Sequence, residues 1–317
     1  MTRLRAGVIG AGYMGRLHVR LLGEVPGVEP VVVVDPAPSA HDLGLPVVAD
    51  LGSLPDLVDF VVLAAPSAIH EPIGLELARL GVPTLIEKPI ATTTESGLRL
   101  VRAFAKAGTA AAAGHIERFN PVVTAICHAL ADDAIGPVVS MATSRVGPFP
   151  DRDMPVGVVA DLLVHDIDLA CYLLDARYSS VTAEMQTEPG RPCEDAVEVR
   201  GALETTEGRT ITVAHRASRL HPTRERSIRL VGERGALEGD FIEQALTLRT
   251  TGTALSLPVD QGQPLAAELS AWADVVRGGP PDPVLATLAD GLRAVSVAEA
   301  VLASARAGGP VTPEVAA

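Results

Sequence analysis

A glycine-rich turn between an apolar strand and a helix constrains this fold more than any other feature. The stretch "AGVIGAGYMGRLHVRLL" opens with an apolar burst, carries Gly10, Gly12 and Gly15 as GxGxxG, and continues with helical periodicity. In such a turn the first glycine permits a tight bend, the second lets the backbone approach a pyrophosphate, and the third allows close helix–strand packing. The N–H groups at the start of the helix would then face the phosphates.

Strand and helix patterns alternate through the first 120 residues. Continuous apolar runs occur in "VEPVVVVD", "DFVVLAAP" and "VPTLIEKP", and a shorter one in "TAAAAGH". Helical stretches ended by Gly81 and Gly108 separate them. This alternation predicts a doubly wound parallel sheet, a Rossmann domain, over residues 1–120.

Asp35 bears on what this domain binds. It ends the second apolar run, 20 residues after Gly15, where an acidic side chain can accept hydrogen bonds from an adenosine ribose. The alternative is a glycine-rich turn with a strand-capping aspartate and no ligand. A carboxylate repels a 2′-phosphate, and the following "PAPSA" holds no arginine to attract one. We therefore expect NAD as cofactor, in preference to NADP.

The pattern changes after residue 120. Alternating strands such as "DAVEVRGALET" and "RTITVAHRAS" are separated by glycine or charged turns, and helical stretches return at the end. Residues 121–317 are thus predicted to form an α+β domain on a mostly antiparallel open sheet, whose last helices could pack back on the first domain. A broad exposed apolar sheet face is unusual in a monomer, so we expect a homodimer or homotetramer formed through this sheet.

Bulk properties limit the partners. A chain of 317 residues exceeds one typical core, which agrees with two domains. The net charge of −13 argues against nucleic acid and against an anionic membrane surface. Three cysteines without CxxC spacing, a glycine-broken first apolar run and the absence of a long apolar stretch lead us to expect a cytoplasmic protein with reduced thiols.

The stretch "ADLLVHDIDL" carries Asp161, His165 and Asp168 at spacings of four and three, along one face of a predicted helix. An aspartate one turn before a histidine can orient the ring and favour the imidazolium, which suits a general base. Two alternatives remain open. One is a solvated acidic face with an incidental histidine. The other is a metal site, for which no third ligand stands at a usual spacing.

Two further stretches carry polar side chains of the substrate-binding type. The stretch "GHIERFNP" contains His115, Arg118, Phe119 and Asn120. It joins the two halves at the carboxyl edge of the predicted parallel sheet, where doubly wound folds bind ligands; the alternative is a domain linker with ordinary polar residues. In "SRLHPTRERSIRL", Arg219 and Arg224 could hold a phosphate through paired hydrogen bonds. The alternative there is a solvated strand.

Lysine is nearly absent from this chain, which contains only Lys88 and Lys106. Lys88 stands in "LIEKPI", between an apolar run and Pro89. Lysine is a compact charge whose pKa can be moved, whereas arginine is wide and stays protonated. A chemical role for a small, tunable cation would explain Lys88, and so would chance.

Taken together, "GVIGAGYMG", "AAPSAIH", "EKPI" and "DLLVHDIDL" resemble the glucose–fructose oxidoreductase/inositol dehydrogenase (Gfo/Idh/MocA) family. The resemblance spans nearly the whole chain, down to the closing "GGPV". Within the family, "GHIERFNPVV" and "RERSIRLVGERGALEGDFIEQALTL" look like UDP-N-acetylglucosamine 3-dehydrogenases and related sugar 3-dehydrogenases. "GVVAD" lacks the glycine-rich lead often found before the DxxxH helix, so the loop on the substrate side could differ.

The resemblance implies roles for individual residues. Lys88 would lie beside the nicotinamide and contact the substrate hydroxyl, with a Lys–Pro bond that is often cis. His165, steadied by Asp161, would take the hydroxyl proton. The cofactor contacts would come from Gly10, Gly12, Tyr13, Met14, Gly15, Asp35, Ala65, Pro66, Ser67, His70, Glu87 and Lys88.

The resemblance also implies the reaction. A hydride would move between nicotinamide C4 and a ring carbinol of a sugar, a nucleotide sugar or a cyclitol, and Arg219 and Arg224 would hold the diphosphate of a nucleotide sugar. Three alternatives remain open. Lys88 itself could be the base, the protein could be an NAD(P)H-dependent keto-sugar reductase of a biosynthetic pathway, or it could sense dinucleotide without catalysis.

Overall fold

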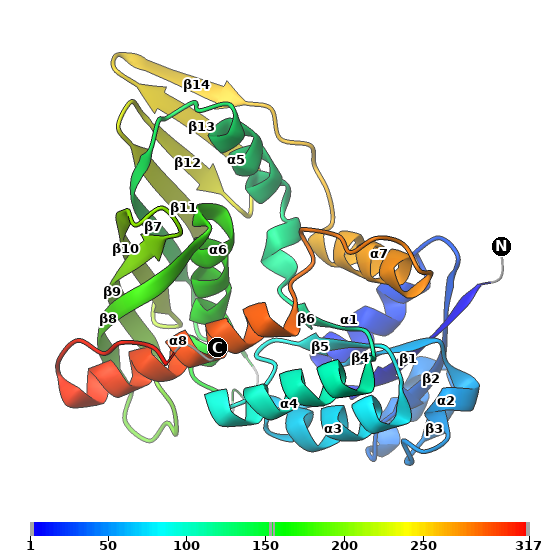
Figure 1. Ribbon diagram of the computed structural model, residues 1–317. Helices are drawn as coiled ribbons and strands as arrows, with labels where there is room; N and C mark the ends of the chain where they lie inside the picture. Colours follow the sequence, from blue (N-terminus) through cyan, green and yellow to red (C-terminus); the bar gives the residue numbers. More distant parts are fainter. Residues whose placement is uncertain (1–2, 152–153, 155, 315–317) are drawn as a thin grey trace. The chain divides into compact units, whose positions relative to one another are not determined.

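The computed structural model describes residues 3–151, 154 and 156–314. These residues form two units (Figure 1). Unit 1 comprises the described residues up to Phe119 together with Gln263–Val295, and unit 2 comprises Asn120–Gly262 together with those from Ser296 onward. None of the described helices has the length and apolar character needed to cross a membrane.

Unit 1 contains a six-stranded parallel sheet. Its strands are β1 (Leu4–Ile9), β2 (Val28–Val34), β3 (Val47–Val48), β4 (Phe60–Leu63), β5 (Thr84–Glu87) and β6 (Ala111–Gly114). They pair in the order β3-β2-β1-β4-β5-β6, and every pairing is parallel. The direction of winding therefore reverses between β1 and β4, which is where doubly wound sheets bind ligands.

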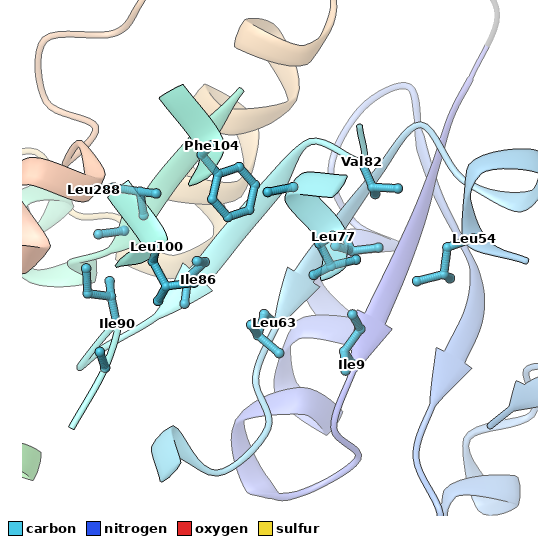
Figure 2. Close-up of a cluster of buried hydrophobic side chains, with 14 of the residues drawn as sticks. Ile9, Leu54, Leu63, Leu77, Val82, Ile86, Ile90, Leu100, Phe104 and Leu288 are labelled. Carbon is cyan, nitrogen blue, oxygen red and sulfur yellow. The ribbon is translucent and has the colours of Figure 1, made fainter. Parts of the chain in front are cut away.

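Helices cover both faces of this sheet. They are α1 (Tyr13–Leu22), α2 (Leu54–Leu57), α3 (His70–Leu80), α4 (Thr94–Ala107), α7 (Pro264–Val276) and the beginning of α8 (Leu288–Ala307), with 3-10 turns η1 (Pro38–Leu43), η2 (Ser67–Ile69) and η3 (Ile116–Phe119). Side chains alternate along each strand. In β4, Val61 and Leu63 belong to the core beneath α3 and α4, and Figure 2 shows this core. Phe60 and Val62 point to the opposite face and belong to the core beneath α1 and α7.

Unit 2 contains an eight-stranded sheet. Its strands are β7 (Val138–Val146), β8 (Ala176–Gln186), β9 (Ala196–Thr205), β10 (Thr210–Ser218), β11 (Glu225–Gly232), β12 (Ala236–Asp240), β13 (Ala245–Thr250) and β14 (Thr253–Leu257). They pair in the order β14-β13-β12-β11-β7-β10-β9-β8. Only one of these pairs, the interior pair of β7 with β10, is parallel. The predicted fold class, a Rossmann sheet followed by a mostly antiparallel open sheet, is thus confirmed.

Helices α5 (Pro121–Ala131) and α6 (Val164–Leu174) cover one face of this sheet, and a π-helical turn, η4 (Val159–Leu163), leads directly into α6 (Figure 1). The prediction of a broad apolar surface on the other face of this sheet is wrong. Its side chains are mostly small, polar or charged, and they include Ala142, Ala214, Arg216, Arg229 and Glu238. Arg229 lies 3.5 Å from Glu238 on the neighbouring strand. Assembly through this sheet stays a prediction, and it cannot rest on an apolar face.

Candidate active site

The turn between β1 and α1 requires two of its glycines on steric grounds. Gly10 has a φ of +97°, and a Cβ there would lie 2.7 Å from the carbonyl oxygen of Ala64. A Cβ on Gly15 would lie 1.8 Å from the carbonyl oxygen of Gly10. The first turn of α1 therefore packs directly on the end of β1, as the GxGxxG spacing predicts.

Gly12 has open space instead, because a Cβ added there would meet no atom within 4 Å. Helix α1 begins at the next residue and has no acidic side chain in its first turn. Its amino end can thus receive a negatively charged group at close range. Tyr13 is 68% exposed, and Met14 is half-buried. This turn fits the pyrophosphate of a dinucleotide.

Asp35 follows β2 and contacts the same turn. Its Oδ2 accepts a hydrogen bond from the N–H of Ala11 at 2.6 Å, and its Oδ1 accepts one from Ala37 at 2.7 Å. A carboxylate has about four acceptor positions, so both oxygens can still accept bonds from ribose hydroxyls. The carboxylate is therefore fixed beside the glycine turn and keeps acceptor positions for a ligand.

His70 supports the loops behind this edge rather than offering a free ring. Ala65, Pro66 and Ser67 follow β4 and lead into α3, whose first residue is His70. The buried ring has Nε2 2.8 Å from the carbonyl oxygen of Ala65 and Nδ1 3.0 Å from that of Pro89. Burial lowers the pKa of His70, although both carbonyls favour the charged form. The imidazole thus joins the loop after β4 to the loop after β5.

Lys88 directly follows β5 and is half-buried. Parallel strands end at one edge of a sheet, so Lys88 stands at the same edge as the glycine turn after β1. Its peptide bond to Pro89 is cis, as the family resemblance implied. The buried Glu87 accepts the backbone N–H of Lys88 at Oε2, over 3.1 Å. His18, which sequence reasoning missed, contacts the other oxygen of Glu87.

The "GHIERFNP" residues have structural partners. Within unit 1, Arg118 is buried with its Nη1 3.5 Å from Asp290, and Phe119 packs on the core beneath α1 and α7. Within unit 2, Asn120 caps α5 by accepting the N–H of Val122 at 3.1 Å, and its amide also donates to the carbonyl of Phe241 at 3.3 Å. His115 is buried directly after β6. For Arg118, Phe119 and Asn120 these contacts favour the structural alternative.

In unit 2, Asp161 lies in η4 and His165 in the first turn of α6. The solvated-face alternative is wrong, because His165, Asp166 and Asp168 are all buried. The expected helix also begins differently, since its first turn is π-helical rather than α-helical. π-Turns are rare and often occur at functional sites. In the part of the chain that the structure describes, no three His, Cys, Asp or Glu side chains are grouped to hold a metal ion.

Arg219 and Arg224 have different surroundings, although both were expected to contact phosphate. Arg219 is only 5% exposed; its Nη2 donates to Asp161 Oδ2 at 2.9 Å and its Nη1 to the carbonyl of Val156 at 2.8 Å. Arg224 is exposed, just before β11. The guanidinium of Arg219 therefore orients Asp161, and Arg224 is the more accessible cation.

Two further polar contacts, one half-buried and one buried, fix the start of α6, and sequence reasoning missed them. The Glu194 carboxylate accepts the N–H of Val159 at 3.0 Å at the beginning of η4. Arg145, on β7, forms a fully buried ion pair of 3.0 Å with Asp166, the residue after His165. Both contacts join residues far apart in the sequence, so no local pattern could have indicated them.

Comparisons with known proteins agree with this architecture. Residues 4–115 match the model of an oxidoreductase family with an NAD-binding Rossmann fold, and residues 123–238 match the Gfo/Idh/MocA C-terminal domain. Inositol 2-dehydrogenase 2 of Saccharopolyspora erythraea is 30% identical, over 99% of this chain and 96% of that protein.

Solved structures show the same fold. The UDP-N-acetylglucosamine 3-dehydrogenase of Acidithiobacillus ferrooxidans has a TM-score of 0.86 at 24% identity, covering 97% of this chain and 99% of that one. Levoglucosan dehydrogenase in complex with NADH also has a TM-score of 0.86, at 19% identity, covering 99% of this chain and 100% of that one. The two family matches and the full-length relative establish that this chain belongs to the Gfo/Idh/MocA family of oxidoreductases with an NAD-binding Rossmann domain.

Proposed function

We propose that this protein is an NAD-dependent dehydrogenase acting on a ring carbinol of a sugar, a nucleotide sugar or a cyclitol. The observation that carries the proposal is the common edge of the unit 1 sheet: the glycine turn after β1, Asp35 after β2 and Lys88 directly after β5 all stand at this edge. A dinucleotide held by such a turn extends along the carboxyl ends of the strands. A cation at the end of β5 is then available to the reacting end of the cofactor.

The cofactor, when bound, supplies the hydride acceptor, which no amino-acid side chain can provide. NAD is preferred over NADP, because the Asp35 carboxylate would repel a 2′-phosphate at the ribose. The backbone N–H groups of Ala11 and Ala37 fix this carboxylate, so it cannot easily turn away.

His165 is the general base in this proposal. It removes the proton from the substrate hydroxyl as the C–H bond breaks, and Asp161 favours the imidazolium that results. Lys88 donates a hydrogen bond to the same oxygen and stabilises the negative charge that develops on it. Asp161 is itself fixed by Arg219, at 2.9 Å.

The substrate class follows from relatives and from chemistry together. The relative that is 30% identical over 99% of this chain is named an inositol 2-dehydrogenase. One structural neighbour is named a UDP-N-acetylglucosamine 3-dehydrogenase. Both names describe oxidation of a secondary alcohol on a six-membered ring. Arg224, exposed before β11, is the cation proposed to contact the diphosphate if the substrate is a nucleotide sugar.

A substrate screen tests this proposal. Purified protein is mixed with NAD and, separately, inositols, free sugars, UDP-sugars and dTDP-sugars, and NADH formation is followed by absorbance. The matching keto-sugars with NADH test the reverse direction. We expect one substrate group to be oxidised by the wild type, and Lys88→Met to lower that turnover by at least about 100-fold. Tight NAD binding with no turnover of any compound in either direction would instead indicate a dinucleotide sensor.

A further inference from the structure

A buried histidine links the helix after the glycine turn to the residue before Lys88. His18 lies on α1, three residues after Gly15, and is 0% exposed. Its Nε2 is 2.7 Å from Oε1 of Glu87, which is 7% exposed at the end of β5. Among the described residues, Nδ1 of His18 has no hydrogen-bond partner. All polar bonding of this ring is therefore directed at the Glu87 carboxylate.

The Glu87 carboxylate in turn fixes the backbone at Lys88. One oxygen accepts from His18, and the other accepts the N–H of Lys88 at 3.1 Å. Burial opposes ionisation, but the hydrogen bond from His18 and the nearby Lys88 charge lower the pKa of Glu87 below its ordinary value. Because an ionised carboxylate can only accept, Nε2 of His18 must be the donor.

The neighbouring strand leaves space for this arrangement. Gly114, on β6, pairs with Glu87. A Cβ on Gly114 would lie 3.2 Å from the Cα and 3.5 Å from the Cδ of Glu87, which is a tight fit. The carboxyl group is thus confined between α1 and a strand position without a side chain. Because the Glu87 carboxylate is confined and His18 is its side-chain donor, the position of His18 determines where this carboxylate holds the N–H of Lys88.

We propose that His18 is a positioning residue for Lys88, acting through Glu87. It ties the peptide from which the Lys88 side chain departs to the helix that begins at the dinucleotide turn. The inference rests on the catalytic role proposed for Lys88. The competing explanation is that the pair only stabilises the fold, since a buried carboxylate needs a partner wherever it lies.

Two amide substitutions separate these explanations. In His18→Gln the side-chain amide can take the place of Nε2 and donate to Glu87, whereas in His18→Asn it matches the position of Nδ1 and falls short. We expect His18→Asn to lower kcat by about 10- to 100-fold, a size typical of small misplacements of a catalytic group. NAD affinity should change little. His18→Gln should recover most of kcat, even if both variants lose similar thermal stability.

A second readout needs no turnover. In protein carrying Lys106→Arg, an exposed position on the last turn of α4, Lys88 is the only lysine and its side chain gives one isotope-labelled NMR signal. We expect His18→Asn to shift or split that signal and His18→Gln to restore it. If wild-type protein has no NAD-linked activity but the signal behaves this way, the proposed function fails and the positioning role stands.

Two results would overturn the positioning role. One is an unchanged Lys88 signal in His18→Asn. The other is a loss of activity in His18→Asn that is explained entirely by weaker NAD binding, or a loss of activity that is proportional to the loss of thermal stability in both the Asn and the Gln variant.

Discussion

Arg219 and Arg224 belong to one sequence stretch, but they should affect catalysis differently. The buried guanidinium of Arg219 contacts Asp161, whereas Arg224 is exposed. Arg224→Ala should raise KM for a UDP-sugar roughly tenfold, the value of one charge-assisted hydrogen bond, and leave inositol unaffected. Arg219→Ala should lower kcat by a similar factor on both substrates.

Steady-state kinetics of the two variants on both substrates test this distinction, with Arg219→Lys as the control that keeps a cation near Asp161. If Arg219→Ala raised KM for the UDP-sugar alone, Arg219 would contact the diphosphate after all, and its contact with Asp161 would be incidental.

Asp35 should determine cofactor choice by charge. We expect kcat/KM with NAD to exceed that with NADP by at least about tenfold, or ~1.4 kcal/mol. Asp35→Asn removes the charge but keeps an acceptor oxygen. It should therefore lower the ratio of kcat/KM with NAD to kcat/KM with NADP, mainly by raising kcat/KM with NADP. Measuring kcat/KM for both cofactors checks this. A wild-type preference for NADP would contradict the assignment.

Within the turn and helix proposed to bind the cofactor, Gly12 and Gly15 form a matched pair. A methyl group on Gly15 would collide with the carbonyl of Gly10, so Gly15→Ala should destabilise the protein by about 1–3 kcal/mol or more. Gly12→Ala meets open space, so the protein should unfold like wild type but bind NAD at least about tenfold more weakly. Thermal unfolding and NAD titration separate the effects. Weaker stability in Gly12→Ala with normal NAD affinity would contradict this interpretation.

At the level of elements, the sequence was most informative where local rules apply. Helices α3 and α4 end at Gly81 and Gly108, both with positive φ, because left-handed backbone at a helix end favours glycine. The buried strands of unit 1 also follow from continuous apolar runs. Strand β14 differs, because four of its five residues are exposed and it has no buried face.

Long-range contacts explain what the sequence could not indicate. The parallel pairing of β7 with β10 joins residues about 70 positions apart, as does the contact of His18 with Glu87. Likewise, the π-turn before α6 is hydrogen-bonded to Glu194 and Arg219, which lie well downstream. The partners that orient the candidate site residues were therefore not predictable from local sequence.

For the whole molecule, buried histidines should make folding sensitive to acid. His215 lies between Thr143, at 2.8 Å, and Tyr178, at 2.6 Å, and burial lowers its pKa to about 4. In the unfolded chain its pKa is about 6.5. Between these values the unfolded state binds the extra proton, so stability is full above pH ~6.5 and falls as pH decreases, by up to about 1.4 kcal/mol per unit.

The test compares wild type with His215→Gln. The variant should be less stable at neutral pH by roughly 1–3 kcal/mol, because buried hydrogen bonds are lost. Its stability should, however, depend less steeply on pH between about 6.5 and 4. Denaturant unfolding over this range measures both quantities. An identical pH slope in the two proteins would show that another group is responsible.

The central claim is that Lys88 and His165 act on one hydroxyl as its hydrogen leaves for the cofactor. It is tested most directly by a single turnover of a substrate deuterated at the reacting carbon, comparing wild type, Lys88→Met, His165→Ala and the double variant. We predict deuterium at nicotinamide C4 in wild type, a loss of about 10²- to 10⁴-fold in each single variant, and no further multiplication of the losses in the double variant. Deuterium released to solvent, near-normal turnover in both single variants, or fully multiplicative losses would contradict the account.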